Sequence, residues 1–428
     1  MDFRTYQTYI NILKHELVPA MGCTEPIAIA YAAAKAKAVL GKAPQRILVL
    51  ASGNIIKNVK SVVVPNSGGR KGIEVAAVLG AFFGDPSRKL EVIEAVTEEE
   101  KSALEDILKN TEVKVKALAS EHVLDLEIHE YFEEDEVSVR IWDTHTNVVN
   151  IIKNGEFLYR SEKTTAPEVS DTEADCNKLD YDLLTVKDIY QFAKEVDISD
   201  VEDIITRQIE NNMAISDEGM SSSYGARIGQ ILAMQDDSVR TLARARAAAA
   251  SDARMGGCDL PVVINSGSGN QGITTSVPII VYAQHYKKNR EELIRAMVLG
   301  NLVTLHLKTG IGRLSSYCGA VSAGVGAGAG IAFLLEGDLR IINHTIVNAI
   351  AISSGIVCDG AKASCAAKIA IAVDAGIFGY EMIMQGSQLR AGEGIVSKGV
   401  ENTIQNINKL GHDGMKETDN KIIEIMTE

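Results

Sequence analysis

The sequence predicts an α+β fold, in which a mainly helical domain carries an inserted α/β domain with a largely antiparallel sheet. Four short segments between residues 112 and 160 alternate apolar and polar residues, as strands with one wet face do. From Asp182 onward, apolar residues recur at helical spacing on an alanine-rich background. The 428-residue chain is also long enough for two or three domains with cores of their own.

Composition and charge exclude several classes of protein. Hydrophobic residues make up 46% of the chain and aromatic residues only 5%, so the core must consist of small side chains that bring backbones close together. A net charge of −14 without any basic stripe argues against nucleic-acid binding. The N-terminal residues show no signal-peptide pattern, and six cysteines are too few for a disulfide scaffold. We therefore expect a cytoplasmic protein with free, metal-binding or catalytic thiols.

Two uncharged stretches, 260–286 and 314–335, are long enough to be considered as membrane spans. The first contains two prolines and several asparagine, serine and glutamine residues, which do not suit a hydrocarbon environment. The second is rich in alanine and glycine and lacks the leucine and phenylalanine of an inserted helix. Both are predicted to be buried segments of a soluble protein, with no membrane partner.

Near the N-terminus, apolar spacing predicts helices over 3–18 and 27–40. Thr24 can cap the second helix, which places Cys23 at a helix N-terminus. The helix dipole and free N–H groups lower the pKa of a thiol at such a position. An ordinary capping turn with a buried cysteine is the alternative, but Gly22 beside the thiol, which permits close approach, favours a functional role.

Two further apolar runs, 47–50 and 62–64, are predicted to be strands. A glycine-rich turn with Asn66 and Ser67 then leads into a predicted helix over 73–83. Backbone amides at a helix start, with cations nearby, can hold a carboxylate, although a simple strand-to-helix connection explains the turn equally well.

A helix over 239–254 carries Arg240, Arg244, Arg246 and Arg254 on an alanine scaffold, and we interpret these side chains as a solvated or ion-pairing face. Residues 265–273, which follow the apolar segment 262–264, offer many amides and hydroxyls and lead into another predicted helix. Such a loop can bind a small anion, and its candidate residues are Asn265, Ser266, Gly267 and Ser268.

Five glycines between residues 319 and 330 superficially resemble a dinucleotide fingerprint. No clear strand precedes them, and no acidic residue follows about twenty positions on, so we reject a Rossmann site. Each glycine in a helix costs about 1 kcal/mol relative to alanine, which close packing must offset. The segment is therefore predicted to be a helix buried at the centre of a bundle.

Three cysteines define the predicted site. Cys358 and Cys365 lie seven residues apart in a small-residue region, and Cys318 precedes them by forty. We interpret these thiols as ligands of one iron–sulfur cluster, since thiolates are its usual ligands and three of them leave one iron open. Zinc would usually need a closer cysteine pair and four ligands. Cys258 or Cys23 could supply the fourth.

These features carry a resemblance to a known family. Asn265–Ile273, Cys318 and the run Ser354–Asp359 followed by Cys365 resemble the α-chain domain of iron–sulfur L-serine dehydratases. The N-terminal run Gly22-Cys23-Thr24-Glu25-Pro26 makes the chain more similar to the related L-cysteine desulfidases. The resemblance covers most of the chain.

The resemblance implies a β-elimination without pyridoxal phosphate, which converts L-cysteine to pyruvate, ammonia and sulfide. It further implies that Cys318, Cys358 and Cys365 hold a 4Fe–4S cluster with one open iron. Cys23, as a thiolate, would remove the α-proton. The residues expected to grip the substrate carboxylate are Asn265, Ser266, Gly267 and Ser268, and also Asn66 and Ser67.

The chain departs from the dehydratases in two respects. It lacks their serine-rich, histidine-containing motif, and its last two cysteines are closer together, which favours L-cysteine over L-serine. The alternatives are a dehydratase of L-serine or another β-substituted amino acid, and a non-catalytic protein that binds a metal or a small ligand. The oligomeric state stays open, with a homodimer as one option.

The domain boundaries follow from the site. Cys23 must come back to the C-terminal cysteines, so the helical domain must be discontinuous. We expect it to combine residues 1–45 with 181–428, while 46–165 form the inserted domain and 166–180 an acidic linker.

Overall fold

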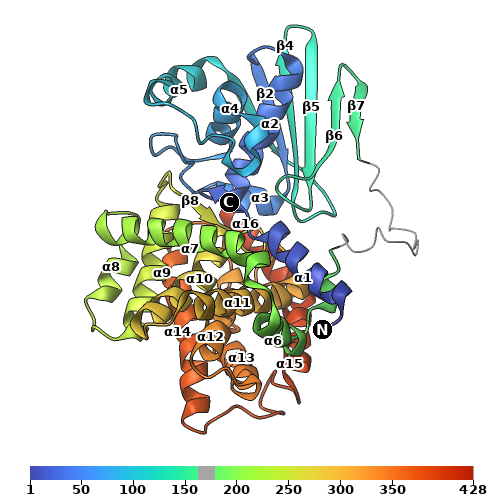
Figure 1. Ribbon diagram of the computed structural model, residues 1–428. Coiled ribbons are helices and arrows are strands. Elements are labelled where there is room, and N and C mark those ends of the chain that lie inside the picture. The colour runs from blue at the N-terminus through green and yellow to red at the C-terminus, as the bar shows by residue number, and fades with distance from the viewer. Residues whose placement is uncertain (162–178, 428) are drawn as a thin grey trace.

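The computed structural model describes residues 1–161 and 179–427 of the chain. Its described part is mostly helical and contains two sheets, which confirms the α+β prediction. Figure 1 shows the larger sheet with its helices above a layered set of long helices. The linker predicted over 166–180 lies outside the described residues except for its last two positions.

The larger sheet is largely antiparallel, as predicted. Its strand order is β3-β2-β4-β5-β6-β7, and only β2 and β3 run parallel. A parallel pair needs a long crossover, and helices α3, α4 and α5 supply it. The strands are β2 (Arg46–Ala51), β3 (Glu112–Ala117), β4 (Asp125–Phe132), β5 (Asp135–Trp142), β6 (Val148–Lys153) and β7 (Glu156–Arg160).

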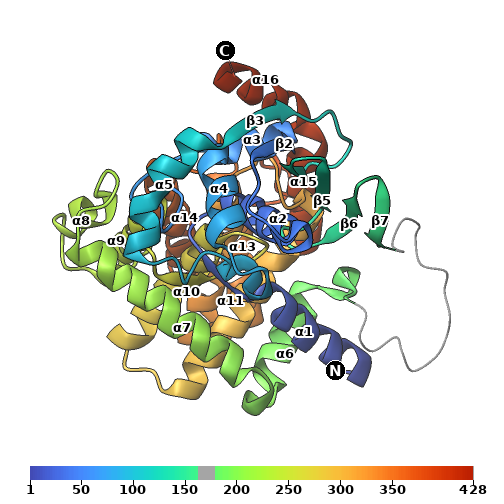
Figure 2. The ribbon, with the colours of Figure 1, turned by 90° about the horizontal axis from the view of Figure 1, so that it is seen from above.

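Helices cover one face of this sheet. The helices in this part are α2 (Thr24–Leu40), α3 (Gly53–Val59), α4 (Ile73–Phe83) and α5 (Glu98–Asn110), and β2 lies between α2 and α3 in the chain. Helix α2 packs against α4, β4 and β5, and Figure 2 shows α2 and α4 beside the strands in the view from above. The predicted helical domain includes α2 within residues 1–45, and its domain limits remain a prediction.

The two apolar runs expected as strands have different outcomes. The run 47–50 lies within β2, and the helix expected over 73–83 is α4. The run 62–64, which follows the end of α3, is not a strand, because it has no partner strand among the described residues and only an isolated bridge joins Val63 to Lys71. Val62 is instead fully buried beside Cys23, so its apolar character serves packing around the site.

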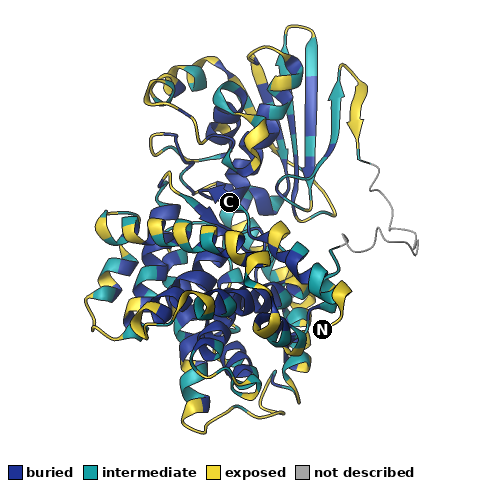
Figure 3. Cartoon of the chain, in the orientation of Figure 1, coloured by how far each residue is buried: buried dark blue, intermediate teal, exposed yellow. Residues whose placement is uncertain are grey.

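The helical part surrounds a glycine-rich helix, as predicted. Helix α12 packs against α10, α11, α13 and α14, and Figure 3 shows these central helices as mostly buried. A Cβ atom added at Gly324 would lie 2.3 Å from the Ala372 carbonyl oxygen. One added at Gly328 would lie 2.5 Å from the Gly376 carbonyl oxygen, so backbone meets backbone along α14.

The remaining helices complete the bundle. They are α1 (Phe3–Glu16), α6 (Val186–Glu195), α7 (Ile198–Ser221), α8 (Ile228–Ala233), α9 (Val239–Met255), α10 (Gly269–His285), α11 (Arg290–Ile311), α12 (Gly319–Leu335), α13 (Leu339–Ser353), α14 (Cys365–Met384), α15 (Val400–Lys409) and α16 (Lys416–Thr427). Short 3-10 helices cover Pro86–Glu91 and Tyr181–Leu183, and a π-helical turn covers Leu410–Gly414. Within the described ranges, no helix is both long and apolar enough to cross a membrane.

A small second sheet joins the N-terminal part of the chain to the loop that precedes α10. Strand β1 (Pro19–Met21) pairs antiparallel with β8 (Pro261–Val263), and the Ile264 N–H extends this pairing to the Val18 carbonyl at 3.0 Å. A helix follows each strand after a short turn, α2 after β1 and α10 after β8. The pairing therefore brings two helix N-termini from distant parts of the chain close together.

Candidate active site

One cavity of about 100 Å³ gathers the predicted cysteines. Cys23, Cys318, Cys358 and Cys365 all line it, although they come from three separate segments, since only Cys358 and Cys365 share one. The structure thus brings the three predicted cluster ligands and the predicted catalytic thiol together. Cys258 is buried but does not line this cavity.

Backbone pairing positions two of the thiols. The Cys358 N–H donates to the Ser316 carbonyl at 2.6 Å, and the Cys318 N–H donates to the Ile356 carbonyl at 3.1 Å. Cys365 is the first residue of α14, and its thiol lies 3.6 Å from the Gly360 carbonyl oxygen. The two loops therefore form a short antiparallel ladder with Cys318 and Cys358 next to each other.

Glycine is required where the second loop meets α3. Gly360 has a φ of +92°, and a Cβ atom there would lie 2.5 Å from the Lys57 carbonyl oxygen. A side chain at this position would force the loop away from α3 and would move Cys358 with it.

Cations surround the thiols. Lys57 and Lys308 are almost fully buried and line the cavity with Lys368. A hydrogen bond from Cys318, together with the charges of Lys57 and Lys308, holds the pKa of Cys358 below its usual range. Burial lowers the pKa of Lys308 to about 8. A set of thiols with compensating cations suits a negatively charged ligand or cofactor.

The donor set indicates what kind of metal group could bind here. Among the described residues, no group of three or more histidine, cysteine, aspartate or glutamate side chains is spaced for a metal ion. An iron–sulfur cluster makes a different demand, because each thiolate binds its own iron and the sulfurs therefore stand farther apart than around one ion. Three thiols on one cavity, each able to bind an iron of its own, fit a cluster better than a single zinc ion.

Cys23 precedes the first residue of α2, as predicted, but its pKa shifts the other way. Burial raises the pKa of the Cys23 thiol well above its usual range, and the neighbouring Glu25 carboxylate adds to the rise. The prediction of a lowered pKa is therefore wrong in direction, because the loss of hydration outweighs the helix N-terminus.

Glu25 is a further residue of the site, which the sequence patterns do not single out. Its carboxylate is buried and accepts hydrogen bonds from Cys23 Sγ and Asn58 Nδ2, each at 2.9 Å. His145 Nε2 lies 3.9 Å away, within ion-pair range. Burial alone would raise the pKa of Glu25, but His145 and the Cys23 hydrogen bond outweigh it and lower the pKa to about 2. The sequence points to a role for Glu25 only through its place in the run Gly22–Pro26, next to Cys23.

The loop predicted to bind substrate divides between two roles. Ser268 lines the cavity. Asn265 turns away and donates to Asn301 Oδ1 at 2.9 Å, while the Gly267 carbonyl accepts the Thr24 hydroxyl at 2.9 Å. Ser266 lies on a neighbouring cavity instead. The loop therefore fixes the start of α2 against α10 and presents only Ser268 to the thiols.

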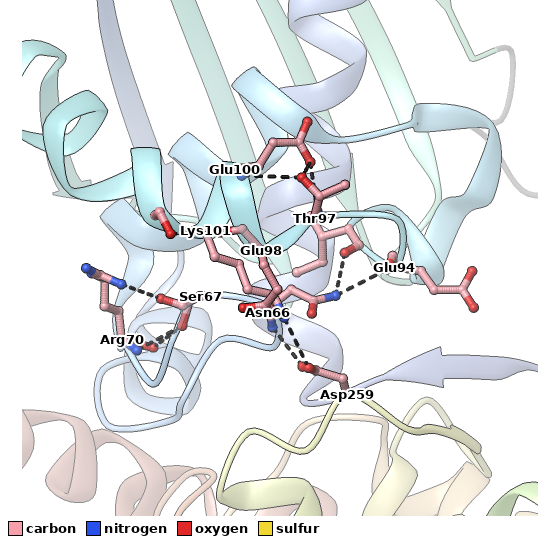
Figure 4. Close-up of polar contacts among 11 residues, drawn as sticks. Asn66, Ser67, Arg70, Glu94, Thr97, Glu98, Glu100, Lys101 and Asp259 are labelled. Atoms are coloured by element: carbon pink, nitrogen blue, oxygen red, sulfur yellow. Dashed lines mark hydrogen bonds and ion pairs between the residues drawn. The ribbon is translucent and has the colours of Figure 1, made fainter.

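Asn66 and Ser67 do not line the thiol cavity. Figure 4 shows them among other partners: the Asn66 N–H donates to Asp259 Oδ1 at 2.9 Å, and its side-chain amide donates to the Ile93 carbonyl at 2.8 Å. The Ser67 hydroxyl donates to the Arg70 carbonyl at 2.9 Å. These contacts hold the turn together and tie it to the Asp259 loop.

The four arginines of α9 do not behave alike. Arg240 binds Asp374 at 2.8 Å, Arg244 lies 3.4 Å from the same carboxylate, and Arg246 pairs with Asp217, as expected of an ion-pairing face. Arg254 is different, because it is 2% exposed and lines the thiol cavity.

The fold and the cavity define an α+β protein that gathers thiols and cations on one cavity. A family model described as serine dehydratase alpha chain matches residues 87–424, and the chain belongs to this family. Membership in this family indicates a lyase.

Similar proteins cover nearly the whole chain. A UPF0597 protein of Desulfitobacterium hafniense is 54% identical over 425 residues, which are 99% of this chain and 97% of that protein. A UPF0597 protein of Finegoldia magna is 48% identical over 424 residues, which are 99% of this chain and all of that protein. A UPF0597 protein of Treponema denticola is 43% identical over 435 residues, which are 100% of this chain and 99% of that protein.

Proposed function

We propose that the chain is an iron–sulfur lyase that eliminates the β-substituent of a small α-amino acid, with L-cysteine as its substrate. The products would be pyruvate, ammonia and sulfide, and no pyridoxal phosphate would take part. The observation that supports this proposal is the position of Cys318, Cys358, Cys365 and Cys23 on one buried cavity.

Cys318, Cys358 and Cys365 would hold the cofactor. When bound, a 4Fe–4S cluster with three cysteine ligands supplies an iron that the protein does not hold, which can act as a Lewis acid toward a leaving group. Lys308 would balance part of the negative charge of the thiolates, whereas Lys57, which also lines the cavity, pairs with Asp419. The buried walls of the cavity would keep bulk water away from the reacting substrate.

Cys23 and Glu25 would move the proton. Cys23 Sγ takes the α-proton of the substrate while its own proton passes to Glu25 Oε2 along their hydrogen bond. The electrons of the broken C–H bond form the carbon–carbon double bond, and the β-substituent leaves with the electrons of its bond. The resulting aminoacrylate tautomerises and is hydrolysed to pyruvate and ammonium.

L-serine is the second candidate substrate, because the matching family model is described as the serine dehydratase alpha chain. The two amino acids differ only in the atom of the leaving group, so the same groups could bind and deprotonate either one. The close spacing of Cys358 and Cys365 and the Gly22–Pro26 run support L-cysteine.

Anaerobic purification followed by two assays tests the proposal. Iron and acid-labile sulfide would be measured in the protein, and then sulfide release from L-cysteine would be compared with ammonia release from L-serine. Bound iron and faster turnover of L-cysteine are expected. Bound iron with turnover of L-serine alone would make the protein a dehydratase. A protein that binds no iron under these conditions and turns over neither substrate is no lyase of this type.

A further inference from the structure

Arg254 is a buried cation that the proposed chemistry leaves unused. Its side chain is 2% exposed at the end of α9, and its Nε atom has no hydrogen-bond partner. Among the described residues, no carboxylate lies within ion-pair distance of its guanidinium, although the other arginines of the helix have such partners. A buried, unpaired charge is costly, so it indicates a missing anion.

Arg254 faces the thiol cavity beside Cys23. Both residues line that cavity, and the Arg254 charge is close enough to favour the Cys23 thiolate. An anion bound by this guanidinium would therefore lie next to the thiol that is proposed to take the α-proton.

A helix start lies against the same guanidinium. Ser268 and Asn270, at the beginning of α10, also line the cavity, and the first N–H groups of a helix have no partner within it. A Cβ atom added at Gly269 would lie only 2.3 Å from Arg254 Nε, so glycine is needed for the helix to approach the arginine. The positive end of α10 and a guanidinium thus converge on one position.

We propose that Arg254 and the first turn of α10 bind the α-carboxylate of the substrate, an inference that rests on the proposed lyase function for the identity of the anion. A planar guanidinium matches a carboxylate with two parallel hydrogen bonds.

Gln271 completes the site. It lies in the same first turn of α10 and lines the cavity, and its buried Oε1 atom has no partner. That oxygen accepts a hydrogen bond from the α-ammonium group. The site therefore selects α-amino acids with a free carboxylate and excludes their amides and the corresponding amines.

Paired ligands test the carboxylate site without turnover. L-alanine has the α-carboxylate and α-ammonium groups but no leaving group, whereas L-alaninamide lacks the negative charge. Binding of each to the anaerobic holoprotein would be measured by calorimetry. We expect the wild type to prefer L-alanine by at least about 30-fold, the size expected for loss of one partner of a buried charge pair. No preference would overturn the inference.

Arg254→Gln should abolish that preference, and it should raise the KM for L-cysteine by a similar factor. Arg246→Gln is the matched control, because it removes a charged side chain from the same helix. Arg246 pairs with Asp217 and does not line the cavity, so this variant should leave the preference for L-alanine and the KM for L-cysteine unchanged. If Arg254→Gln does not fold, Gly269→Ala keeps the charge, displaces the guanidinium and should weaken L-alanine binding.

An Arg254→Gln protein that binds L-alanine as the wild type does would contradict the inference. A wild type that prefers L-alanine but turns over no substrate would contradict the proposed function alone. The two failures are therefore distinguishable.

Discussion

The Cys23 thiol donates a hydrogen bond to Glu25 Oε2 over 2.9 Å, and both side chains are buried at the start of α2. The pKa of the thiol is raised and that of the carboxylate is lowered to about 2, so at neutral pH the pair holds one proton, on sulfur. A thiol in this state can act as a base only if its proton has somewhere to go. Glu25 is the hydrogen-bonded acceptor, and because its pKa is low it takes the thiol proton only in the step in which sulfur takes the α-proton.

We predict that Glu25→Gln lowers kcat for L-cysteine by about 100-fold or more, the usual contribution of a general base, because an amide cannot accept the thiol proton. KM and iron content should change little, since Glu25 is not expected to contact the cluster ligands. Steady-state kinetics and iron analysis measure both effects. Glu74→Gln, which alters the exposed first-turn glutamate of α4, should have wild-type kinetics. Equal losses in the two variants would exclude a role for Glu25.

We predict that replacing Cys318, Cys358 or Cys365 with serine lowers the iron and acid-labile sulfide content of anaerobically purified protein to a small fraction of the wild-type value. A serine hydroxyl is a far weaker ligand for iron than a thiolate. Cys258→Ser is the control, because Cys258 is buried but lies off the cavity, and it should retain its iron. Cys23→Ser should keep iron and lose turnover; loss of iron from this variant would instead make Cys23 a ligand.

Local patterns account for what the sequence predicts correctly. The alternation along residues 124–128 and 137–141 predicts β4 and β5, because period-2 patterning depends only on neighbouring residues. The apolar run 62–64 has the same character, but it finds no partner strand and packs beside Cys23. Whether an apolar run forms a strand depends on a partner strand, and that partner can be far away in the sequence.

The candidate site divides in the same way. The three cysteines could be identified because a motif places them, whereas Arg254 and Glu25 depend on contacts between distant segments. One signal for Arg254 was present: it follows Ala250 by four residues and Ala247 by seven, which places it on the buried face of α9. Arg240 precedes Arg254 by fourteen residues and lies on nearly the same face, so only the contacts of the folded chain distinguish the ion-paired Arg240 from the unpaired Arg254.

Glu130 should make stability depend on pH. It occupies an inward position of β4, is fully buried, and has no hydrogen-bond partner for either carboxylate oxygen. Burial raises its pKa well above the ordinary value of 4.5, so the folded protein keeps a proton that the unfolded chain releases. The free energy of unfolding should therefore fall as pH rises above 4.5, by up to about 1.4 kcal/mol per pH unit, until the folded-state pKa is reached.

Glu130→Gln removes this titration, so its unfolding free energy should decline less between pH 5 and pH 8 than that of the wild type, roughly by the contribution of one proton. Urea unfolding at several pH values, followed by circular dichroism, measures the difference. Glu127→Gln changes a neighbouring position on the same strand that is only half-buried, and it provides the control. Parallel pH profiles for the wild type and Glu130→Gln would contradict a neutral, buried carboxyl group.

The contact between α12 and α14 supports the loops on which the cysteines lie, since Cys318 and Cys365 immediately precede or begin these two helices. Gly328→Ala would place a Cβ atom 2.5 Å from the Gly376 carbonyl oxygen, and backbone cannot move aside as a side chain can. We predict a loss of about 1–3 kcal/mol in the free energy of unfolding, despite the better helix propensity of alanine. Thermal unfolding of the purified variants measures this loss. The control is Gly355→Ala, whose added Cβ atom would meet no atom within 4 Å, so its free energy of unfolding should be close to that of the wild type. If both variants melt with the wild type, the helices are not packed through their backbones, and the cysteines would need another means of support.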